Sequence, residues 1–366
     1  MISSQPYGTL ASGETVTVFT LAGRGSLLLE VITYGGAVTR LLAPDREGKL
    51  DDVVLGYDDL DHYLRGRLYF GAITGRVAGR IPNASFTLNG KTYNLARNDL
   101  PHHLHGGLAG FDKKLWTATP SNRADGAPSL RLTYLSADGE EGYPGNVQAA
   151  VTYTVLDDNI FLIESEASTD QTTPFSLTHH SYFNLAGHGA GSIADHFIEI
   201  FASEYVPVGE DLILCGRLES VEGRGNDLRA ARRFGDIIPS LAQRHGDLYA
   251  VPSGSKHELA PAARVQHAAS GRVLSVSTTE PFLQLYTGSH LEGPVSGKRG
   301  ACSSRHGGFC LECEGYPDPS IVSMRSLLHP GAAQFRATAY AFSASESLPA
   351  NLRQHGAYAN IQERAN

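Results

Sequence analysis

The chain of 366 residues carries 30 Lys and Arg against 38 Asp and Glu, which gives a formal net charge of −8. This negative balance argues against nucleic acid as a partner, because phosphate binding needs a basic surface. The proportions of hydrophobic residues (41%) and charged residues (19%) are those of a globular protein and not of a disordered chain.

The sequence also disfavours membranes and secretion. No apolar run approaches the ~20 residues that cross a bilayer, and residues 1–10 lack the basic and apolar regions of a secretion signal. Four cysteines are too few and too scattered for a disulfide framework. We therefore expect a cytoplasmic protein in a reducing setting, with no membrane partner.

Short strands and frequent turns are the pattern along the chain, which holds 40 Gly and 18 Pro. Runs of period two, rich in β-branched and aromatic residues, predict strands over residues 26–33, 130–135, 149–155, 160–166, 196–201, 272–278, 282–287 and 335–343. Few helices are expected. Asp227 is placed to cap a short helix over residues 228–234, and a further turn is expected over residues 237–243.

These strands predict an all-β fold, a large antiparallel β-sandwich with few short helices, because so many strands would not close one flat sheet. No Pro- or Ser-rich linker divides the chain, so we expect residues 1–345 to form a single domain. Residues 346–366 are polar and lose the strand pattern, which indicates a C-terminal tail. The concave face of one sheet would then be a natural trough for a ligand.

Two Gly-containing motifs carry candidate binding groups. In GRVAGRI, residues 75–81, an arginine flanked by glycines can present its guanidinium to a polar ligand, although the pattern alone favours a surface arginine on an edge strand. HHLHGG, residues 102–107, invites a zinc interpretation, but no H-E-x-x-H or paired C-x-x-C completes such a site. His105 is the best placed of its histidines to face a ligand, because glycine permits close approach.

Two further motifs carry candidate acid–base groups. His179 and His180 are adjacent in a strand-like run, so only one of them can face the trough, where an imidazole could deliver a proton near neutral pH. The other would be a hydrogen-bonded structural histidine. Glu312 lies in the apolar run GFCLECE, residues 308–314, where a buried carboxylate is costly without a role or a partner. It is a candidate base, and a salt bridge to arginine is the alternative.

Together these motifs resemble the aldose 1-epimerase family, in segments that follow in order over residues 10–343. The combination of LHGG, EEGYPG, HSYFNL and GFCLE in this order is specific. The matching segments are DVVLGY (52–57), GRVAGRI (75–81), LHGG (104–107), DGEEGYPG (138–145), HSYFNLAG (180–187), HAASGR (267–272), QLYTG (284–288) and GFCLE (308–312).

The resemblance implies an isomerase that interconverts the α and β anomers of free aldoses such as galactose or glucose, with no metal and no organic cofactor. Carried over by position, Glu312 matches the family's general base and His180 its general acid. The substrate-binding residues that the resemblance implies are Arg80, His105, Asp247 and Gln284. Asp247 is the nearest candidate for a family aspartate, although an ungapped match places Gly246 there.

The chain departs from the family's pattern at Gly79, His179 and Ser289, where Asn is usual, and at Glu314 and Gly315, in a segment after the base that carries Gln in relatives. The departures leave the implied acid and base in place. They bear on sugar preference, because amide side chains of this kind set hydroxyl recognition.

The implied reaction needs one proton removed from the C1 hydroxyl and one given to the ring oxygen. We expect Glu312 to be ionised and to take the first, and His180 to be charged and to give the second, with their mutual attraction favouring both charges. Rotation of the open aldehyde and reclosure would follow with the roles reversed. His105 and Arg80 would stabilise charge developing on oxygen.

Three alternatives remain open. A mutarotase for phosphorylated sugars would need a basic cluster at the trough rim, and the available cluster of Arg224, Arg229, Arg232 and Arg233 falls in a connection. A non-catalytic carbohydrate-binding protein and a repurposed isomerase or cyclase for a non-sugar hemiacetal are also compatible with the fold. The pair of His180 and Glu312 favours an enzyme with a small-molecule sugar substrate, as a monomer or weak homodimer.

Overall fold

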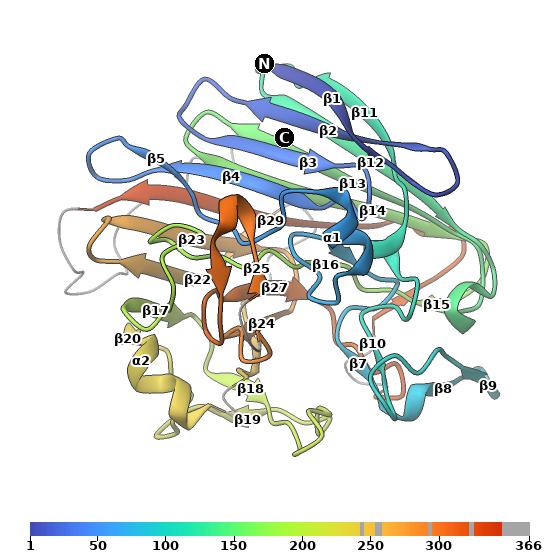
Figure 1. The fold of residues 1–366 in the computed structure, drawn as a ribbon. Helices are drawn as coiled ribbons and strands as arrows, with labels where there is room; N and C mark the ends of the chain where they lie inside the picture. Colours follow the sequence, from blue (N-terminus) through green and yellow to red (C-terminus); the bar gives the residue numbers. More distant parts are fainter. Residues whose placement is uncertain (242–244, 253–257, 292–294, 322–325, 346–366) are drawn as a thin grey trace.

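The computed structural model describes residues 1–241, 245–252, 258–291, 295–321 and 326–345. Most of its regular structure is antiparallel strand (Figure 1). The prediction of a large antiparallel β-sandwich with few short helices is therefore confirmed. The predicted tail, residues 346–366, lies outside the described residues. None of the helices in the described ranges has the length and apolarity to cross a membrane.

Three larger sheets are formed by the described residues. The first contains, in spatial order, β1 (Ile2–Thr9), β2 (Thr15–Ala22), β3 (Leu28–Ile32), β4 (Val38–Pro44) and β5 (Leu50–Asp52). The second contains β11 (Thr117–Asn122), β12 (Pro128–Ser136), β13 (Val147–Leu156), β14 (Ile160–Thr169), β29 (Gln334–Ala344), β23 (Arg272–Thr278), β22 (Ala260–His267), β17 (His196–Ile200) and β20 (Arg232–Arg233). The third contains β19 (Glu219–Ser220), β18 (Glu204–Val206), β21 (Leu248–Ala250), β24 (Phe282–Tyr286) and β27 (Cys310–Glu314).

Short two-stranded ribbons and helices connect the sheets. The ribbons pair β7 (Arg80–Ile81) with β10 (His103–Leu104), β6 (Ile73–Thr74) with β16 (Thr178–His179), β8 (Ser85–Leu88) with β9 (Lys91–Asn94), β15 (Thr173–Pro174) with β28 (Leu327–Leu328), and β25 (Val295–Ser296) with β26 (Cys302–Ser303). The α-helices of the described residues are α1 (Leu60–Arg65) and α2 (Phe234–Ile237).

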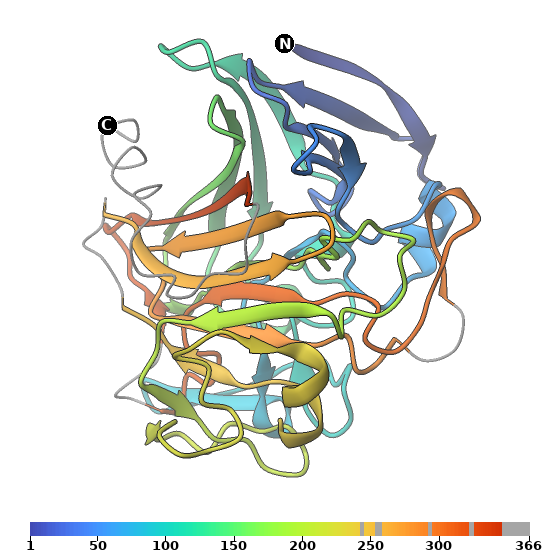
Figure 2. The same cartoon turned by 90° about the vertical axis from the view of Figure 1, so that its left-hand side faces the viewer.

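The second sheet packs against both other sheets. Its strands β12 and β13 contact β2 of the first sheet, and β29 contacts β4. The hydroxyl of Tyr340 on β29 donates a hydrogen bond to the carbonyl oxygen of Leu311 on β27 of the third sheet, at 2.9 Å. Strands β17, β22, β23 and β29 run side by side across the molecule (Figure 2). A continuous buried core, which includes Leu21, Phe161 and Leu283, joins the three sheets, and each such side chain contributes about 1.5–3 kcal/mol.

The alternation of apolar and polar residues predicted several of these strands correctly. Each of the eight predicted strands is present, as β3, β12, β13, β14, β17, β23, β24 and β29. The short helix α1 was not predicted, because six residues are too few to show the 3.6-residue repeat of apolar side chains by which a helix is recognised. Its N-terminus is capped by the carboxylate of Asp59, which accepts a hydrogen bond from the backbone N–H of His62 at 3.0 Å.

The helix predicted over residues 228–234 is wrong. Arg232 and Arg233 instead form the edge strand β20, paired with Ile198 and Phe197 of β17. The carboxylate of Asp227 accepts hydrogen bonds from the backbone N–H and the guanidinium of Arg229. Pairing with an open sheet edge satisfies more backbone groups than one isolated turn would, so tertiary context overrides the local capping signal.

The first arginine of GRVAGRI is structural. Arg76 is 2% exposed, and its guanidinium donates to the hydroxyl of Ser136 at 2.8 Å and to the carbonyl oxygens of Pro144, Ser136 and Ala137 at 2.9, 3.0 and 2.6 Å. It thereby fixes the loop that contains EEGYPG to the segment that leads into β7, which carries the second arginine of the motif.

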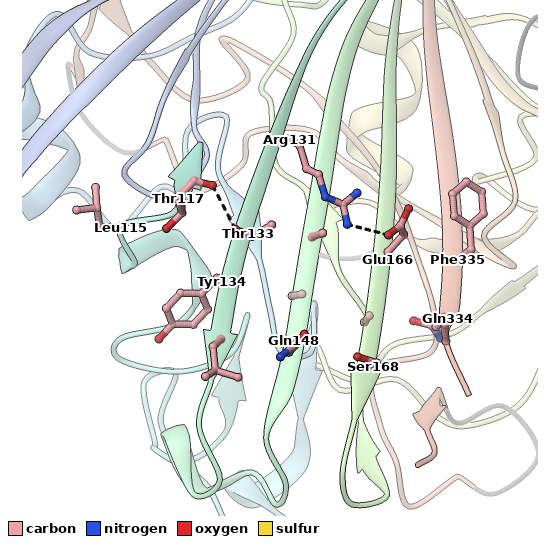
Figure 3. A pocket seen from close by; sticks show the side chains of 15 residues that line it. Leu115, Thr117, Arg131, Thr133, Tyr134, Gln148, Glu166, Ser168, Gln334 and Phe335 are labelled. Atoms are coloured by element: carbon pink, nitrogen blue, oxygen red, sulfur yellow. Dashed lines mark hydrogen bonds and ion pairs between the residues drawn. The ribbon is translucent and has the colours of Figure 1, made fainter. Parts of the chain in front are cut away.

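We expect Arg76→Met to lower the free energy of unfolding by about 3 kcal/mol, because it leaves the carbonyl oxygens of this loop without a buried donor. Urea denaturation measures the effect. Arg131→Met is the control: Arg131 is partly exposed on the central sheet and pairs with Glu166 at 2.9 Å (Figure 3), a surface ion pair worth less than ~1 kcal/mol. Equal losses in the two variants would contradict the structural role of Arg76.

Candidate active site

One pocket of about 130 Å³ collects most of the predicted site residues, namely Arg80, His105, His180, Gln284 and Glu312. A larger hollow of about 810 Å³ lies over β11–β14 and β29 (Figure 3). The charged side chains that line this larger hollow, Arg131 and Glu166, pair with each other. The smaller pocket is the candidate active site, because buried acid–base groups converge in it.

Glu312 and Gln284 reach the pocket from neighbouring strands. They are direct cross-strand partners in the antiparallel pair of β27 with β24, so their side chains leave the sheet on the same face. The neighbours of Glu312 on β27, Leu311 and Cys313, point to the other face and join the hydrophobic core. The alternation of apolar and polar residues thus directs the carboxylate into the pocket.

His180 follows the two-residue strand β16, and its backbone is held on both sides. Its N–H donates to the carbonyl oxygen of Ala72 at 2.9 Å, and its carbonyl oxygen accepts from the N–H of Gly71 at 3.0 Å. The adjacent His179 faces the core instead, where its Nε2 lies 2.7 Å from the hydroxyl of Ser181. The expectation that one histidine of the pair is structural agrees with this placement.

His180 and Glu312 meet inside the pocket. The Nε2 atom of His180 lies 3.6 Å from Oε1 of Glu312, and the side chains are 4% and 3% exposed. The other ring nitrogen, Nδ1, lies 3.6 Å from the sulfur of Cys310. A carboxyl and an imidazole this close can both reach the oxygens on one carbon atom of a ligand.

The histidines of HHLHGG separate in the structure. Nδ1 of His102 accepts a hydrogen bond from the N–H of Asn83, and His103 contacts the hydroxyl of Tyr143 at 2.8 Å. His105 is the one of the three that lines the pocket, and its ring centroid is 5.2 Å from that of His180.

Glycine after His105 is required by packing. Gly106 has φ of +89°, and a Cβ atom there would lie 1.6 Å from the carbonyl oxygen of Gly75. Nδ1 of His105 accepts a hydrogen bond from the N–H of Gly79 at 3.2 Å. The proton of the neutral ring is therefore on Nε2, which makes His105 a donor there.

Arg80 is oriented by an ion pair at the pocket wall. It lies on β7, and its Nε donates to the carboxylate of Asp99 at 2.7 Å. Its positive charge opposes part of the effect of burial on Glu312.

Burial holds the acid–base groups neutral. Removal from water raises the pKa of Glu312 to about 8 and lowers the pKa of His180 to about 4. Burial, together with the charge of neighbouring groups such as His180, also holds the pKa of His105 well below its usual range. We expected mutual attraction to keep Glu312 and His180 charged. Desolvation of the two groups outweighs that attraction and favours the neutral form of each.

Asp247 is placed differently from the other predicted residues. Its buried carboxylate accepts a hydrogen bond from the side-chain amide of Asn226 at 3.2 Å, and burial raises its pKa to about 6. Of the described residues in this segment, His245 and Gly246 line the pocket and Asp247 does not. The ungapped match to Gly246 therefore describes the pocket wall better.

Several pocket residues were not predicted from the sequence, namely Tyr69, His245, Tyr286, His290 and Glu314. The ring of Tyr69 packs on His105 and His180, with centroids 4.8 and 5.7 Å apart. Tyr69, His245 and His290 come from loops, where the sequence has no periodic pattern to show which side chains face a ligand. Glu314 could have been predicted from the alternation of the strand, since it lies on the same face of β27 as Glu312.

His105, His180 and Glu312 are also the residues that could hold a metal ion within the described part of the chain. One ligand atom from each lies within 4.8 Å of the others. Two imidazoles and a carboxylate suit a transition metal, but the same set serves proton transfer at a sugar carbon.

Comparisons with known proteins identify the family of this chain. The family model described as aldose 1-epimerase matches residues 17–333. A galactose mutarotase from Bos taurus is 44% identical over 342 residues, 92% of this chain and 97% of its own length. An aldose 1-epimerase from Escherichia coli (strain K12) is 32% identical and covers 91% of this chain and 96% of its own. The crystal structure of an aldose epimerase homologue from C. elegans superposes with a TM-score of 0.81 at 28% identity, over 89% of this chain and 98% of that one.

The neutral state of His180 can be observed by NMR of protein with ¹³C-labelled histidine. We expect its ring shifts to change with a midpoint near pH 4, because burial disfavours the imidazolium. Glu312→Gln should move this midpoint little. A midpoint near the ordinary value of about 6.5 that falls in the Gln variant would show that attraction to Glu312 governs the titration.

Proposed function

We propose that this chain, which belongs to the aldose 1-epimerase family, interconverts the α and β anomers of free aldoses through Glu312 and His180. The chain is an isomerase that acts on carbohydrates. The observation that carries the proposal for the site is the 3.6 Å approach of the buried carboxyl and imidazole.

A cyclic aldose is a hemiacetal, and its ring opens when the C1 hydroxyl loses a proton while the ring oxygen gains one. Moving both protons together avoids a full alkoxide and a full oxocarbenium ion. A pair of groups that carries one proton meets this demand, because one member accepts a proton as the other gives one.

The direction of transfer follows from the proton count. Moving the shared proton from Glu312 to His180 yields a carboxylate and an imidazolium that attract each other, and Arg80 further favours the carboxylate. Glu312 then takes the proton of the C1 hydroxyl, and His180 protonates the ring oxygen. The C1–O5 bond breaks, and an open aldehyde forms.

Reclosure uses the same two groups in reverse. After rotation about C1–C2, His180 takes the proton back from the C5 hydroxyl as its oxygen attacks the aldehyde, and Glu312 returns a proton to the carbonyl oxygen. His105, with its proton on Nε2, and Arg80 are placed to donate hydrogen bonds to oxygen atoms on which charge develops. Gln284 would bind a sugar hydroxyl.

Free sugars fit the pocket better than phosphorylated ones. Three of the four arginines of the connection are paired with carboxylates: Arg224 with Glu219, Arg229 with Asp227, and Arg233 with Asp195. None of the four lines the pocket. Arg80 is paired with Asp99. Relatives named galactose mutarotase support galactose, and with it glucose, as substrates.

We also infer the location, the domain organisation and the oligomeric state of the protein. The few scattered cysteines favour work in the cytoplasm, with no membrane or nucleic-acid partner. The core that joins the three sheets favours one domain over residues 1–345. We infer a monomer or weak homodimer, because the pocket is assembled from one chain.

Glu312→Gln should lower the turnover of α-galactose or α-glucose at least ~100-fold, the usual size of a general-base effect. The fold should be retained, since an amide is easier to bury than a carboxylate. Polarimetry of freshly dissolved α-sugar measures the reaction after subtraction of the spontaneous rate.

Glu199→Gln is the matched control for this change. Glu199 is a buried glutamate on β17 and does not line the pocket. Its variant should keep wild-type turnover. Near-wild-type anomerisation by the Glu312 variant would refute the assignment of the base.

The pH dependence of kcat/KM should reflect a pair that works with one proton. That form is lost as pH rises through about 8, where Glu312 loses its proton, and as pH falls through about 4, where His180 gains one. We therefore expect a plateau at weakly acidic and neutral pH and a decline above about 8. A decline that already begins near pH 6.5 would indicate a histidine with its ordinary pKa.

A further inference from the structure

The pocket holds a second buried carboxyl that the anomerisation chemistry does not use. Glu314 lies two residues after Glu312 on β27, on the same face of the strand, and lines the pocket. It is 2% exposed, and its Oε2 atom has no hydrogen-bond partner among the described residues. A buried carboxyl oxygen without a partner is costly, so its retention calls for an explanation.

The backbone opposite Glu314 carries no side chain. Gly79 has φ of +79°, and a Cβ atom built there would lie 3.5 Å from Oε1 of Glu314 and 2.9 Å from Cβ of Pro317. Gly79 and Glu314 both lie in segments that depart from the resemblance, and both line the pocket. A side chain at position 79 would meet Pro317, so the room for a ligand beside Glu314 is the pocket itself.

The chemistry of the Glu314 carboxyl fits a polar ligand. Carboxyl oxygens accept hydrogen bonds and a sugar hydroxyl donates one, so the unpartnered Oε2 atom and a sugar hydroxyl are complementary.

We propose that Glu314 is a specificity-determining residue that binds one hydroxyl group of the aldose in the pocket. This rests on the proposed function, in which Glu312 is next to C1. Alternate residues on a strand are about 7 Å apart, so the hydroxyl bound by Glu314 is not the anomeric one. The preferred substrates are then aldoses that carry a hydroxyl group at that position.

The test compares glucose with its 2-, 3-, 4- and 6-deoxy analogues, using kcat/KM from polarimetry. In the wild-type protein, kcat/KM for one analogue should be lower than for glucose by about ten-fold or more, because the hydroxyl group missing from that analogue is the one that Glu314 binds. In Glu314→Met, which keeps the side-chain length but cannot hydrogen-bond in this way, that penalty should shrink to less than about two-fold. Glu314→Ala provides a second variant in case the Met side chain disturbs folding.

Cys313→Ala is the control for disturbance of β27, because Cys313 faces the core from the opposite side of the strand. It should keep the wild-type pattern of penalties. The same pattern in wild type and in a folded Glu314 variant would overturn the role of Glu314 while leaving anomerisation intact. A wild-type protein that anomerises no aldose would overturn the proposed function instead, and calorimetric binding of the same sugars would then test Glu314 separately.

Discussion

The burial of a carboxyl and an imidazole 3.6 Å apart is the constraint on which the rest of the site depends. Removing both groups from water costs several kcal/mol if each keeps its charge, so the pair retains one proton and no net charge. Such a pair can pass a proton in either direction with little change in solvation. That property suits a reaction whose substrate and product differ only in configuration at one carbon.

Holding these two groups together requires parts of the chain that are far apart in sequence. Glu312 is fixed by the ladder of β27 with β24, which also positions Gln284. His180 is fixed by backbone bonds to Ala72 and Gly71, and the segment after Gly71 continues towards Arg76, whose guanidinium anchors a further loop. Main-chain hydrogen bonds therefore hold the backbone of each proposed catalytic group, which favours the preorganisation that proton transfer needs.

The sequence predicted eight strands correctly, because period two is explicit in segments such as 272–278, and it predicted the strand-like run that contains Glu312. Strands such as β2, β4 and β22 were not predicted. Prediction failed where a distant partner decides the outcome. Arg232 and Arg233 follow a capping residue yet pair with the edge of β17. The protonation of Glu312 and His180 could not be predicted from the motifs, since it depends on how completely water is excluded. His245 and Tyr69 reach the pocket from loops, where the sequence carries no periodic signal.

The groups proposed for proton transfer match the family's pattern, whereas a group proposed for substrate recognition departs from it. Glu312 and His180 match the family's motifs, whereas Gly79 and Glu314 line the pocket in segments that depart from those motifs. Because the acid and base sit on the rigid centre of β27 and beside β16, the wall around them can exchange one hydrogen-bonding group for another without moving the reacting atoms. Substrate choice in this fold can therefore change independently of the proton transfers at C1.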